Sequence, residues 1–519
     1  MKDKFLQGAF ILTVAGLAVK VLGSVNRILL SRLLGGEGIG LYQLAYPIYL
    51  FLISVSGAGV PVAISILVAK KVAQKDYAGA QRIFKASLFL MLMTGLFFAI
   101  GLYLAANWFI TSGIIRDGRA YYAIMALIPA VFFSTLLASA RGYFQGHQMM
   151  LPPAVSQIIE QFMRVMVMLG LAYYLLPRGL EYAAAGAAFG AVPGAVTGLI
   201  VLSYFYYKHK ELRNNALLVP AGTTESLTTI GKKLLLLALP VSCANLMLPL
   251  VTGIDMLFVP ARMEVAGFNV KEATTAFGYL AGMALPLVTM STIPTTSLAA
   301  SVVPAISEAK ALQHDSSIEN KISMVLRLCM LFTMPAAVGL IILGPAISAL
   351  IYGTSKAGAV ISALAPSIVF LGLHQVSTGI LQGLGYTLIP MVTMLVSAGI
   401  KILALWVLVA NPLYNILGAA WASNLNFAVA AGLNIIFLLI YGKCKIPWLS
   451  LGRITLAASS MGGVVFLVYS LSSEVLGAKI GTLLAIVLGI ISYGGLLFLW
   501  REFTPKQLRQ IIEKRKKRK

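Results

Sequence analysis

Fourteen runs of mainly apolar residues follow one another along the chain. A helix needs roughly 20 such residues to cross the hydrocarbon core of a bilayer. These runs restrict the fold more than any other feature, because a water-soluble domain could not bury all of them. The runs cover approximately residues 6–33, 38–69, 83–110, 120–143, 151–176, 182–207, 233–259, 273–305, 323–351, 358–381, 387–410, 414–441, 452–472 and 478–500.

The composition agrees with lipid as the main solvent of the surface. Of the 519 residues, 59% are hydrophobic and 11% are charged, whereas soluble globular proteins carry about 25% charged residues. The net charge of +23 would by itself suit a nucleic-acid-binding surface. The basic residues lie between the apolar runs, however, as in membrane proteins. We therefore expect an all-α polytopic membrane protein with no nucleic-acid partner.

The basic residues also predict the orientation of the chain. With the N-terminus placed in the cytoplasm, the cytoplasmic connections hold 28 Lys and Arg residues and the outer connections hold 8. An excess of this kind marks the cytoplasmic side. We expect a multi-pass protein of the cytoplasmic membrane with both termini inside. The basic tail over 501–519 would bind anionic lipids of the inner leaflet, and a solvated tail is an equal alternative.

A segment near the N-terminus returns some 240 residues later. Pro61 to Phe84 and Pro304 to Leu331 both lead from an apolar run through a short charged segment into a new apolar run. The pairs Gln145-Gly146 and Gln382-Gly383, and Gly186-Ala187-Ala188 and Gly418-Ala419-Ala420, follow in the same order. Such spacing indicates a duplicated chain. Because each copy has six helices, an even number, the copies form a parallel repeat.

The repeat predicts five parts. They are an N-lobe over 1–207, a cytoplasmic linker over 208–232, a C-lobe over 233–441, two extra helices within 442–500 and the basic cytoplasmic tail over 501–519. The charged segment after Pro61 and its copy would join helices 2 and 3 and helices 8 and 9. We expect these two loops to act at the inner gate.

Several polar and charged side chains fall inside predicted spans, where a charge costs about 2.5–3.5 kcal/mol on insertion scales. The first span contains Lys20, Asn26 and Arg27, and the fifth contains Glu160 and Arg164 at i,i+4 spacing. The excess of cations suits a diphosphate, because Lys and Arg pair with phosphate oxygens. We predict that these five residues line a substrate cavity.

Structural roles compete with this interpretation. Glu160 and Arg164 could form a mutually neutralised pair, and Arg27 could extend its charged end to the membrane surface. For Asp255 and Arg262 near the outer end of the seventh span, and for Lys401 in the eleventh, we expect gating or structural roles.

No enzymatic motif is visible. The sequence contains no GxxxxGK[ST] loop, no HExxH and no nucleophile elbow, the motifs typical of phosphate-cradling loops, zinc proteases and serine hydrolases. Its three cysteines and four histidines are dispersed, without metal-ligand spacing. We expect a secondary transporter rather than an enzyme, with no cofactor and with a coupling ion that the sequence leaves undefined.

Three segments resemble stage V sporulation protein B and its polysaccharide-exporter relatives. They are VKVLGSVNRILLSRLLG from Val19, the stretch from Arg141 through SQIIEQFMRV to Val165, and GIDMLFVPARM from Gly253. The resemblance implies a two-lobed, fourteen-helix fold of the superfamily that includes lipid II flippases and multidrug and toxin extrusion (MATE) antiporters. It also implies movement of undecaprenyl-diphosphate-linked sugars to the outer leaflet, with a role in spore cortex peptidoglycan in a Gram-positive, spore-forming bacterium.

The resemblance is partial at the predicted site. Gram-negative lipid II flippases have the pattern Ser-Arg-x-Leu-Gly-x-x-Arg-Asp in the first helix, where this chain reads VKVLGSVNR. Lys20 keeps the first cation, and Asn26 and Arg27 replace the Arg-Asp pair. The eleventh span lacks the acidic residue found at a sodium site in some relatives, which argues against sodium coupling here.

These observations predict a flippase or exporter for a lipid II-like cell-wall precursor that works by alternating access. Its partners would be the lipid-linked oligosaccharide and the cell-wall synthesis machinery, and helices 13 and 14 would form a groove for the lipid tail. The alternative is a MATE-type drug or cation antiporter, which would need acidic groups exposed in its cavity. A third class is a membrane scaffold that transports nothing.

Overall fold

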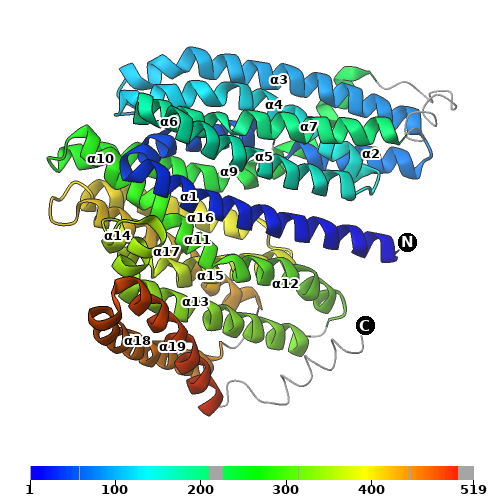
Figure 1. Ribbon diagram of the computed structural model, residues 1–519. Helices are drawn as coiled ribbons and strands as arrows, with labels where there is room; N and C mark the ends of the chain where they lie inside the picture. Colours follow the sequence, from blue (N-terminus) through cyan, green and yellow to red (C-terminus); the bar gives the residue numbers. More distant parts are fainter. Residues whose placement is uncertain (1, 58, 210–225, 314, 443–445, 501–519) are drawn as a thin grey trace. The chain divides into compact units, whose positions relative to one another are not determined.

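The computed structural model describes residues 2–57, 59–209, 226–313, 315–442 and 446–500, which form helices and no strand (Figure 1). Most of the predicted linker over 208–232 and the whole predicted tail over 501–519 lie outside these residues. Contacts between Cα atoms divide the chain into two compact units, Met1–Gly278 and Tyr279–Lys519. Each unit is described by itself.

Unit 1 is a bundle in which α1 and α4 pack against several other helices. Its helices are α1 (Lys2–Gly57), α2 (Val60–Ala73), α3 (Tyr77–Thr111), α4 (Tyr121–Gly146), α5 (Leu151–Leu175), α6 (Leu180–Phe189), α7 (Ala191–Lys208), α9 (Leu227–Val265) and α10 (Val270–Phe277), with short 3-10 turns η1 (Gly118–Ala120) and η2 (Leu176–Arg178). A core of buried apolar side chains forms among α2, α3, α4, α7 and α9.

Unit 2 begins within a π-helical segment, η3 (Gly278–Ala284). Its helices are α11 (Leu285–Ser291), α12 (Ile293–Ala311), α13 (Asp315–Tyr352), α14 (Gly358–Leu364), α15 (Ser367–Gly383), α16 (Leu388–Leu408), α17 (Asn415–Gly442), α18 (Trp448–Leu476) and α19 (Ala478–Leu499). Its core forms among α12, α13, α15 and α17, and α18 and α19 pack on α13.

The described helices confirm a polytopic all-α membrane fold. Twelve of them are long and apolar enough to cross a membrane, or thirteen if the bent pair of α14 and α15 counts as one span. One of the twelve, Val14–Ala73, has 60 residues, which is about 90 Å of helix against a hydrocarbon core of roughly 30 Å. It bends at Gly35, where φ is 66° and ψ is −172°. The segment includes α1 on both sides of this kink and all of α2, which begins at Val60, so it is long enough for the first two predicted spans.

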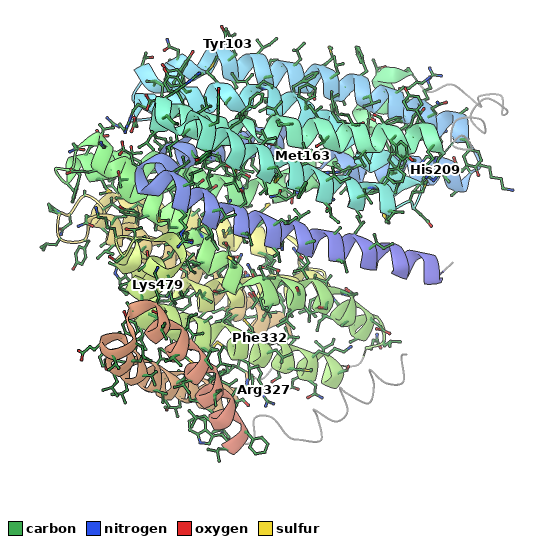
Figure 2. The ribbon with its side chains drawn as sticks, in the orientation of Figure 1. Tyr103, Met163, His209, Arg327, Phe332 and Lys479 are labelled. Carbon is green, nitrogen blue, oxygen red and sulfur yellow. The ribbon has the colours of Figure 1, made fainter. Side chains whose placement is uncertain are left out.

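Large apolar side chains cover the outside of the helices, as lipid contact requires. On α3, Tyr103 points away from unit 1 (Figure 2) and its neighbour Leu104 is 70% exposed. Phe97, two turns earlier, is 71% exposed. An apolar surface of this kind is stable in a bilayer and would aggregate in water.

The backbone turns at corresponding places in the two halves of the chain. Ten of the eleven residues with positive φ in the described chain form pairs whose members lie 232 to 240 residues apart. The pairs are Gly35 and Gly267, Lys75 and Gln313, Gly113 and Gly353, Gln148 and Gly385, and Gly179 and Asn415. The eleventh, Gly477, lies between α18 and α19, which are outside the predicted repeat. This periodicity supports the duplication.

Close helix packing repeats as well. In unit 1, a Cβ on Gly142 of α4 would lie 2.8 Å from the carbonyl oxygen of Pro61 on α2. In unit 2, a Cβ on Gly379 of α15 would lie 2.7 Å from the carbonyl oxygen of Ala299 on α12. Glycine permits this approach because it has no side chain. The same helix pair is thus built in the same way twice.

The boundary between the packing units differs from the predicted boundary between the repeats. Unit 1 includes α9 and α10, which the sequence assigns to the second copy, and α9 packs against α1, α2 and α3. A packing unit groups helices that touch, whereas a repeat groups helices that correspond. The lobe boundaries within 208–232 and near 441 therefore stay a prediction.

Candidate functional site

The centre of the candidate site is Glu160 on α5, which accepts hydrogen bonds from two arginines. Arg164 donates to one carboxylate oxygen and Arg141 of α4 donates to the other, both at 2.7 Å. Arg141 also donates to the hydroxyl of Ser156 at 3.1 Å. The charged side chains are only 14% to 17% exposed. Two guanidinium groups around one carboxylate leave a net positive charge inside unit 1.

Glycines along one face of α7 allow α5, which carries Glu160 and Arg164, to pack closely against it. Gly190, Gly194 and Gly198 recur every fourth residue at and after the start of α7. A Cβ on Gly194 would lie 3.0 Å from the carbonyl oxygen of Glu160 and 3.1 Å from the Cβ of Arg164. Small residues at this spacing are typical of close helix contacts in membranes. The backbone of α5 therefore rests directly on α7 behind the charged pair.

The bent helix α1 supplies a second wall. Asn26 and Arg27 precede the bend, and Tyr42, Tyr46 and Tyr49 follow it at helical spacing. The guanidinium carbon of Arg27 lies 6.0 Å from the centroid of the Tyr46 ring, at the limit of a cation–π contact. The ring centroids are 5.2 Å apart for Tyr42 and Tyr46 and 5.8 Å apart for Tyr46 and Tyr49.

The tyrosines connect this wall to α4 and α5. Tyr42 lies within electrostatic range of both Arg27 and Arg164. The hydroxyl of Tyr49 is hydrogen-bonded to that of Ser134 on α4 at 3.1 Å. The three helices α1, α4 and α5 thus bring three arginines, one carboxylate and an aromatic row to one part of unit 1.

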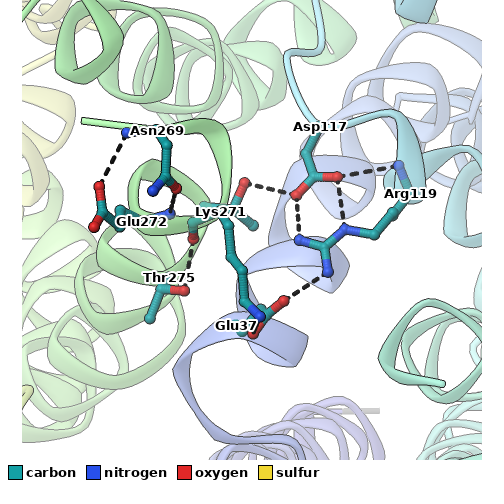
Figure 3. A network of polar contacts seen from close by, with 8 residues as sticks. Glu37, Asp117, Arg119, Asn269, Lys271, Glu272 and Thr275 are labelled. Atoms are coloured by element: carbon teal, nitrogen blue, oxygen red, sulfur yellow. Dashed lines mark hydrogen bonds and ion pairs between the residues drawn. The ribbon is translucent and has the colours of Figure 1, made fainter. Parts of the chain in front are cut away.

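A second polar cluster in unit 1 is centred on Arg119, just before α4 (Figure 3). Its guanidinium donates to Asp117 at 2.8 Å and to Glu37 of α1 at 2.6 Å. Thr274 of α10 donates to Asp117 at 3.0 Å, and the ammonium of Lys271 lies 3.4 Å from Glu37. The cluster ties α1 just after its bend to the α3–α4 connection and to α10.

The structure brings together four of the five residues predicted to line the cavity, namely Asn26, Arg27, Glu160 and Arg164. The fifth, Lys20, lies two turns before Arg27 on α1 with an exposed side chain. The substrate-binding roles of these residues stay a prediction.

The residues predicted to have gating or structural roles fall in both units. Asp255 on α9 is 8% exposed, and Arg262 lies in the last turn of the same helix. Lys401 on α16, in unit 2, is only 1% exposed. Their roles also stay a prediction.

Sequence reasoning missed Arg141 and the tyrosines as site residues. Arg141 comes at the end of the fourth apolar run, so the sequence predicts a position on the cytoplasmic side and not in the site. The 42–46–49 spacing, visible in LYQLAYPIYL, is a usable signal because it puts the three rings on one helix face. The Arg119 cluster carries no local signal, since Glu37 and Arg119 are 82 residues apart.

Unit 2 contains an apolar cavity of about 580 Å³ bounded by α11, α13, α18 and α19. Phe332 (labelled in Figure 2) and Pro335 of α13, Met461 of α18 and Tyr493 of α19 line it. Such a cavity suits a hydrocarbon chain. Among the described residues, no group of three or more His, Cys, Asp or Glu side chains could hold a metal ion.

Known proteins are similar to this chain in sequence. The family described as polysaccharide biosynthesis protein matches residues 5–310. Stage V sporulation protein B of Bacillus subtilis (strain 168) is 31% identical over 84% of this chain and 83% of its own length. The lipid II flippase MurJ of the same organism is 28% identical over 85% of this chain and 82% of its own length.

Two solved structures show the same architecture. The lipid II flippase MurJ in an inward closed conformation matches with a TM-score of 0.69 and 14% identity, over 95% of this chain and 99% of that one. An inward-facing multidrug resistance MATE family transporter matches with a TM-score of 0.68 and 16% identity, over 82% and 94%. The MATE-like fold expected from the sequence is therefore confirmed.

Proposed function

The chain belongs to the polysaccharide biosynthesis protein family, and on that premise we propose that it moves an undecaprenyl-diphosphate-linked cell-wall precursor across the membrane by alternating access. Its sequence relatives include a lipid II flippase, and the family is one of membrane flippases and exporters rather than enzymes. The precursor would be lipid II-like and would serve peptidoglycan synthesis, including that of the spore cortex.

The positive charge of the buried site is the observation that carries this proposal. Arg141 and Arg164 share a single carboxylate, Glu160, inside unit 1, and Arg27 adds a third cation beside Tyr46. An uncompensated cation in a membrane span is costly, and an anionic substrate offsets that cost when it binds. A diphosphate is well matched, because its oxygens accept several hydrogen bonds from guanidinium groups.

The apolar cavity of unit 2 supports the same substrate. A polyprenyl tail needs a hydrocarbon-lined path outside the polar site, and the cavity beside α18 and α19 provides one. These two helices are the thirteenth and fourteenth predicted spans, which lie outside the repeat. They would hold the lipid tail.

The charged cluster around Arg119 would act as a closing contact during transport. It joins α1, the α3–α4 connection and α10 through hydrogen bonds of 2.6–3.0 Å, and the count of basic residues assigns this end to the outer side. Asp255, Arg262 and Lys401 would support the same movement without contacting substrate. The protein would lie in the cytoplasmic membrane of a spore-forming bacterium with both termini inside.

A leaflet-resolved assay of lipid II in cells that depend on this protein tests the proposal. We expect Lys20→Ala and Arg27→Ala to lower outward movement of lipid II about tenfold or more, because hydrogen bonds to charged groups contribute about 1.5–3 kcal/mol each. Arg178→Ala, at an exposed position after α5, is the matched control and should transport normally.

Normal transport by both Lys20→Ala and Arg27→Ala would contradict the assigned roles. A MATE-type antiporter would instead protect cells against cationic dyes and leave lipid II on the inner leaflet. The charge of the site argues against that function, because the carboxylate of Glu160 is already shared by two arginines.

A further inference from the structure

The helices α1 and α5 meet side by side near Asn26. A Cβ on Gly23 would lie 3.4 Å from the amide nitrogen of Gln161. Further along both helices, the amide of Asn26 donates to the sulfur of Met168 at 2.8 Å. Arg164 lies between Gln161 and Met168, so it belongs to the stretch of α5 that runs beside Gly23 and Asn26 of α1.

Two polar atoms at this interface are buried and have no hydrogen-bond partner in the described structure. They are the Oδ1 atom of Asn26 and the Nε atom of Arg164. Asn26 is only 5% exposed, so water does not reach it freely. Buried polar atoms are nearly always paired in native proteins. The unpaired acceptor on α1 and the unpaired donor on the neighbouring stretch of α5 are therefore candidate contacts for a ligand group.

The two atoms require different chemistry. Asn26 Oδ1 can only accept a hydrogen bond and Arg164 Nε can only donate one. A phosphate oxygen could satisfy the arginine but not the asparagine, because an ionised phosphate has no hydrogen to donate. A sugar hydroxyl can do both, since it donates one hydrogen bond and accepts others.

The aromatic ring of Tyr46 lies within electrostatic range of Arg164. Tyr46 is partly exposed, unlike the buried Tyr42 and Tyr49, and it carries Arg27 over its ring. The C–H face of a pyranose ring is apolar and packs on aromatic rings, while its hydroxyls point to polar groups at the edge. The neighbouring guanidinium of Arg27 is then placed for the phosphate attached to that sugar.

We propose that Asn26, Tyr46 and the Nε of Arg164 form a subsite for the first sugar of the carried glycan, with Arg27 binding the adjacent diphosphate. This inference rests on the proposed function, because it divides that same site into a sugar part and a phosphate part. Its consequence is selectivity: the protein binds a sugar-bearing lipid diphosphate and discriminates against the bare carrier that returns from cell-wall synthesis.

Binding to the purified full-length protein in detergent tests the subsite. The two probes are undecaprenyl diphosphate and undecaprenyl diphosphate linked to one N-acetylhexosamine, measured by native mass spectrometry. We expect the wild type to bind the sugar-bearing lipid about tenfold more tightly, the size of effect that one or two hydrogen bonds produce. Asn26→Leu and Tyr46→Leu should abolish this preference, because each should lower affinity for the sugar-bearing lipid about tenfold more than affinity for the bare lipid.

Tyr46→Phe is the matched control, because it keeps the ring and should keep the preference. Should Asn26→Leu fail to fold, the two Tyr46 variants decide the question. Equal affinity of the wild type for both lipids would overturn the subsite while leaving the proposed function standing, and so would an equal loss of both lipids in the Leu variants. If the wild type binds neither lipid, the proposed function fails and the subsite fails with it.

Discussion

The carboxylate of Glu160 compensates two guanidinium groups that would otherwise be buried without a partner of opposite charge. We predict that Glu160→Gln lowers the free energy of unfolding by about 3–5 kcal/mol, as breaking a buried ion pair does elsewhere. The readout is the thermal unfolding temperature of the purified protein. Glu474→Gln, at an exposed position near the end of α18, is the control and should unfold like the wild type.

An unchanged unfolding temperature for Glu160→Gln would show that Arg141 and Arg164 reach water or other partners without cost. The sequence predicted the contact of Glu160 with Arg164 because four residues on a helix bring side chains together. It could not predict the second contact. Arg141 is 19 residues from Glu160, and their contact depends on how α4 packs against α5. The contact of Asn26 with Met168, 142 residues away, is likewise a product of packing.

The turn between α2 and α3 is held by the N-cap of α3. Asp76 accepts a hydrogen bond from the backbone N–H of Gly79 and another from the ammonium of Lys71, both at 2.8 Å. The hydrogen bond from Lys71, aided by that from Gly79, lowers the pKa of Asp76 against the opposing effect of partial burial. The carboxylate thus stabilises both the start of α3 and the end of α2.

The sign of the pH dependence follows from that lowered pKa. The stabilisation from Asp76 is fully present above the ordinary Asp pKa of about 4 and is lost as the pH falls through the lower pKa of the folded state. We predict that Asp76→Ala costs about 1 kcal/mol at pH 7, the usual worth of an N-cap. Asp76→Asn should cost less, because it removes the ion pair and keeps a capping oxygen. Unfolding temperatures measured from pH 3 to pH 7 check both.

The difference in unfolding temperature between wild type and Asp76→Asn should persist down to about pH 5. It should disappear only at lower pH, where both side chains are neutral. A gap that grows on acidification would contradict the hydrogen bonding at this turn. The charged composition of the turn was visible in the sequence, because KKVAQKDYAGAQ interrupts two apolar runs. The residue that caps α3 could not be predicted from the sequence, because several polar residues in this turn could have been the N-cap.

Bends inside apolar runs were the least predictable feature of the helices. Hydropathy predicts a break between the first two spans, close to the kink at Gly35, yet it does not show that α2 begins at Val60, inside the second predicted span. Nor does it show the π-helical segment at Gly278–Ala284. At Gly278, where the π-helical segment begins, a Cβ would collide with the carbonyl oxygen of Gly36. Only the packed structure reveals why glycine is needed there.

The duplication, by contrast, could be predicted from the sequence. It also relates residues outside the repeated segments that revealed it. An offset of 237 residues relates Arg164 on α5 to Lys401 on α16, two cations inside membrane spans. The same offset relates Glu160 to Ser397, whose hydroxyl bonds the carbonyl of Met394. The two halves therefore keep a cation at one position and differ in what surrounds it. This difference agrees with the concentration of substrate contacts proposed for unit 1.

In one pair of packed helices, the two halves of the chain place a glycine and a threonine on opposite helices. In unit 1, a Cβ on Gly95 of α3 would collide with the hydroxyl of Thr135 on α4. The corresponding positions in unit 2 have the residues reversed: Thr333 lies on α13, and a Cβ on Gly372 of α15 would lie 2.7 Å from its methyl group. Each helix pair has room for one threonine, and the two halves place it on opposite helices.

We predict that Gly95→Thr destabilises the protein by about 1–3 kcal/mol through overpacking, and that adding Thr135→Gly recovers at least about 1 kcal/mol of that loss. The double variant reproduces in unit 1 the arrangement found in unit 2, so the second change removes the clash that the first creates. Thr135→Gly alone should destabilise, because it weakens α4 and leaves a small void. Unfolding temperatures of the wild type, the two single variants and the double variant measure the coupling between positions 95 and 135. Strictly additive losses would mean that the two positions do not share one packing space, and the correspondence between the halves would not extend to their interiors.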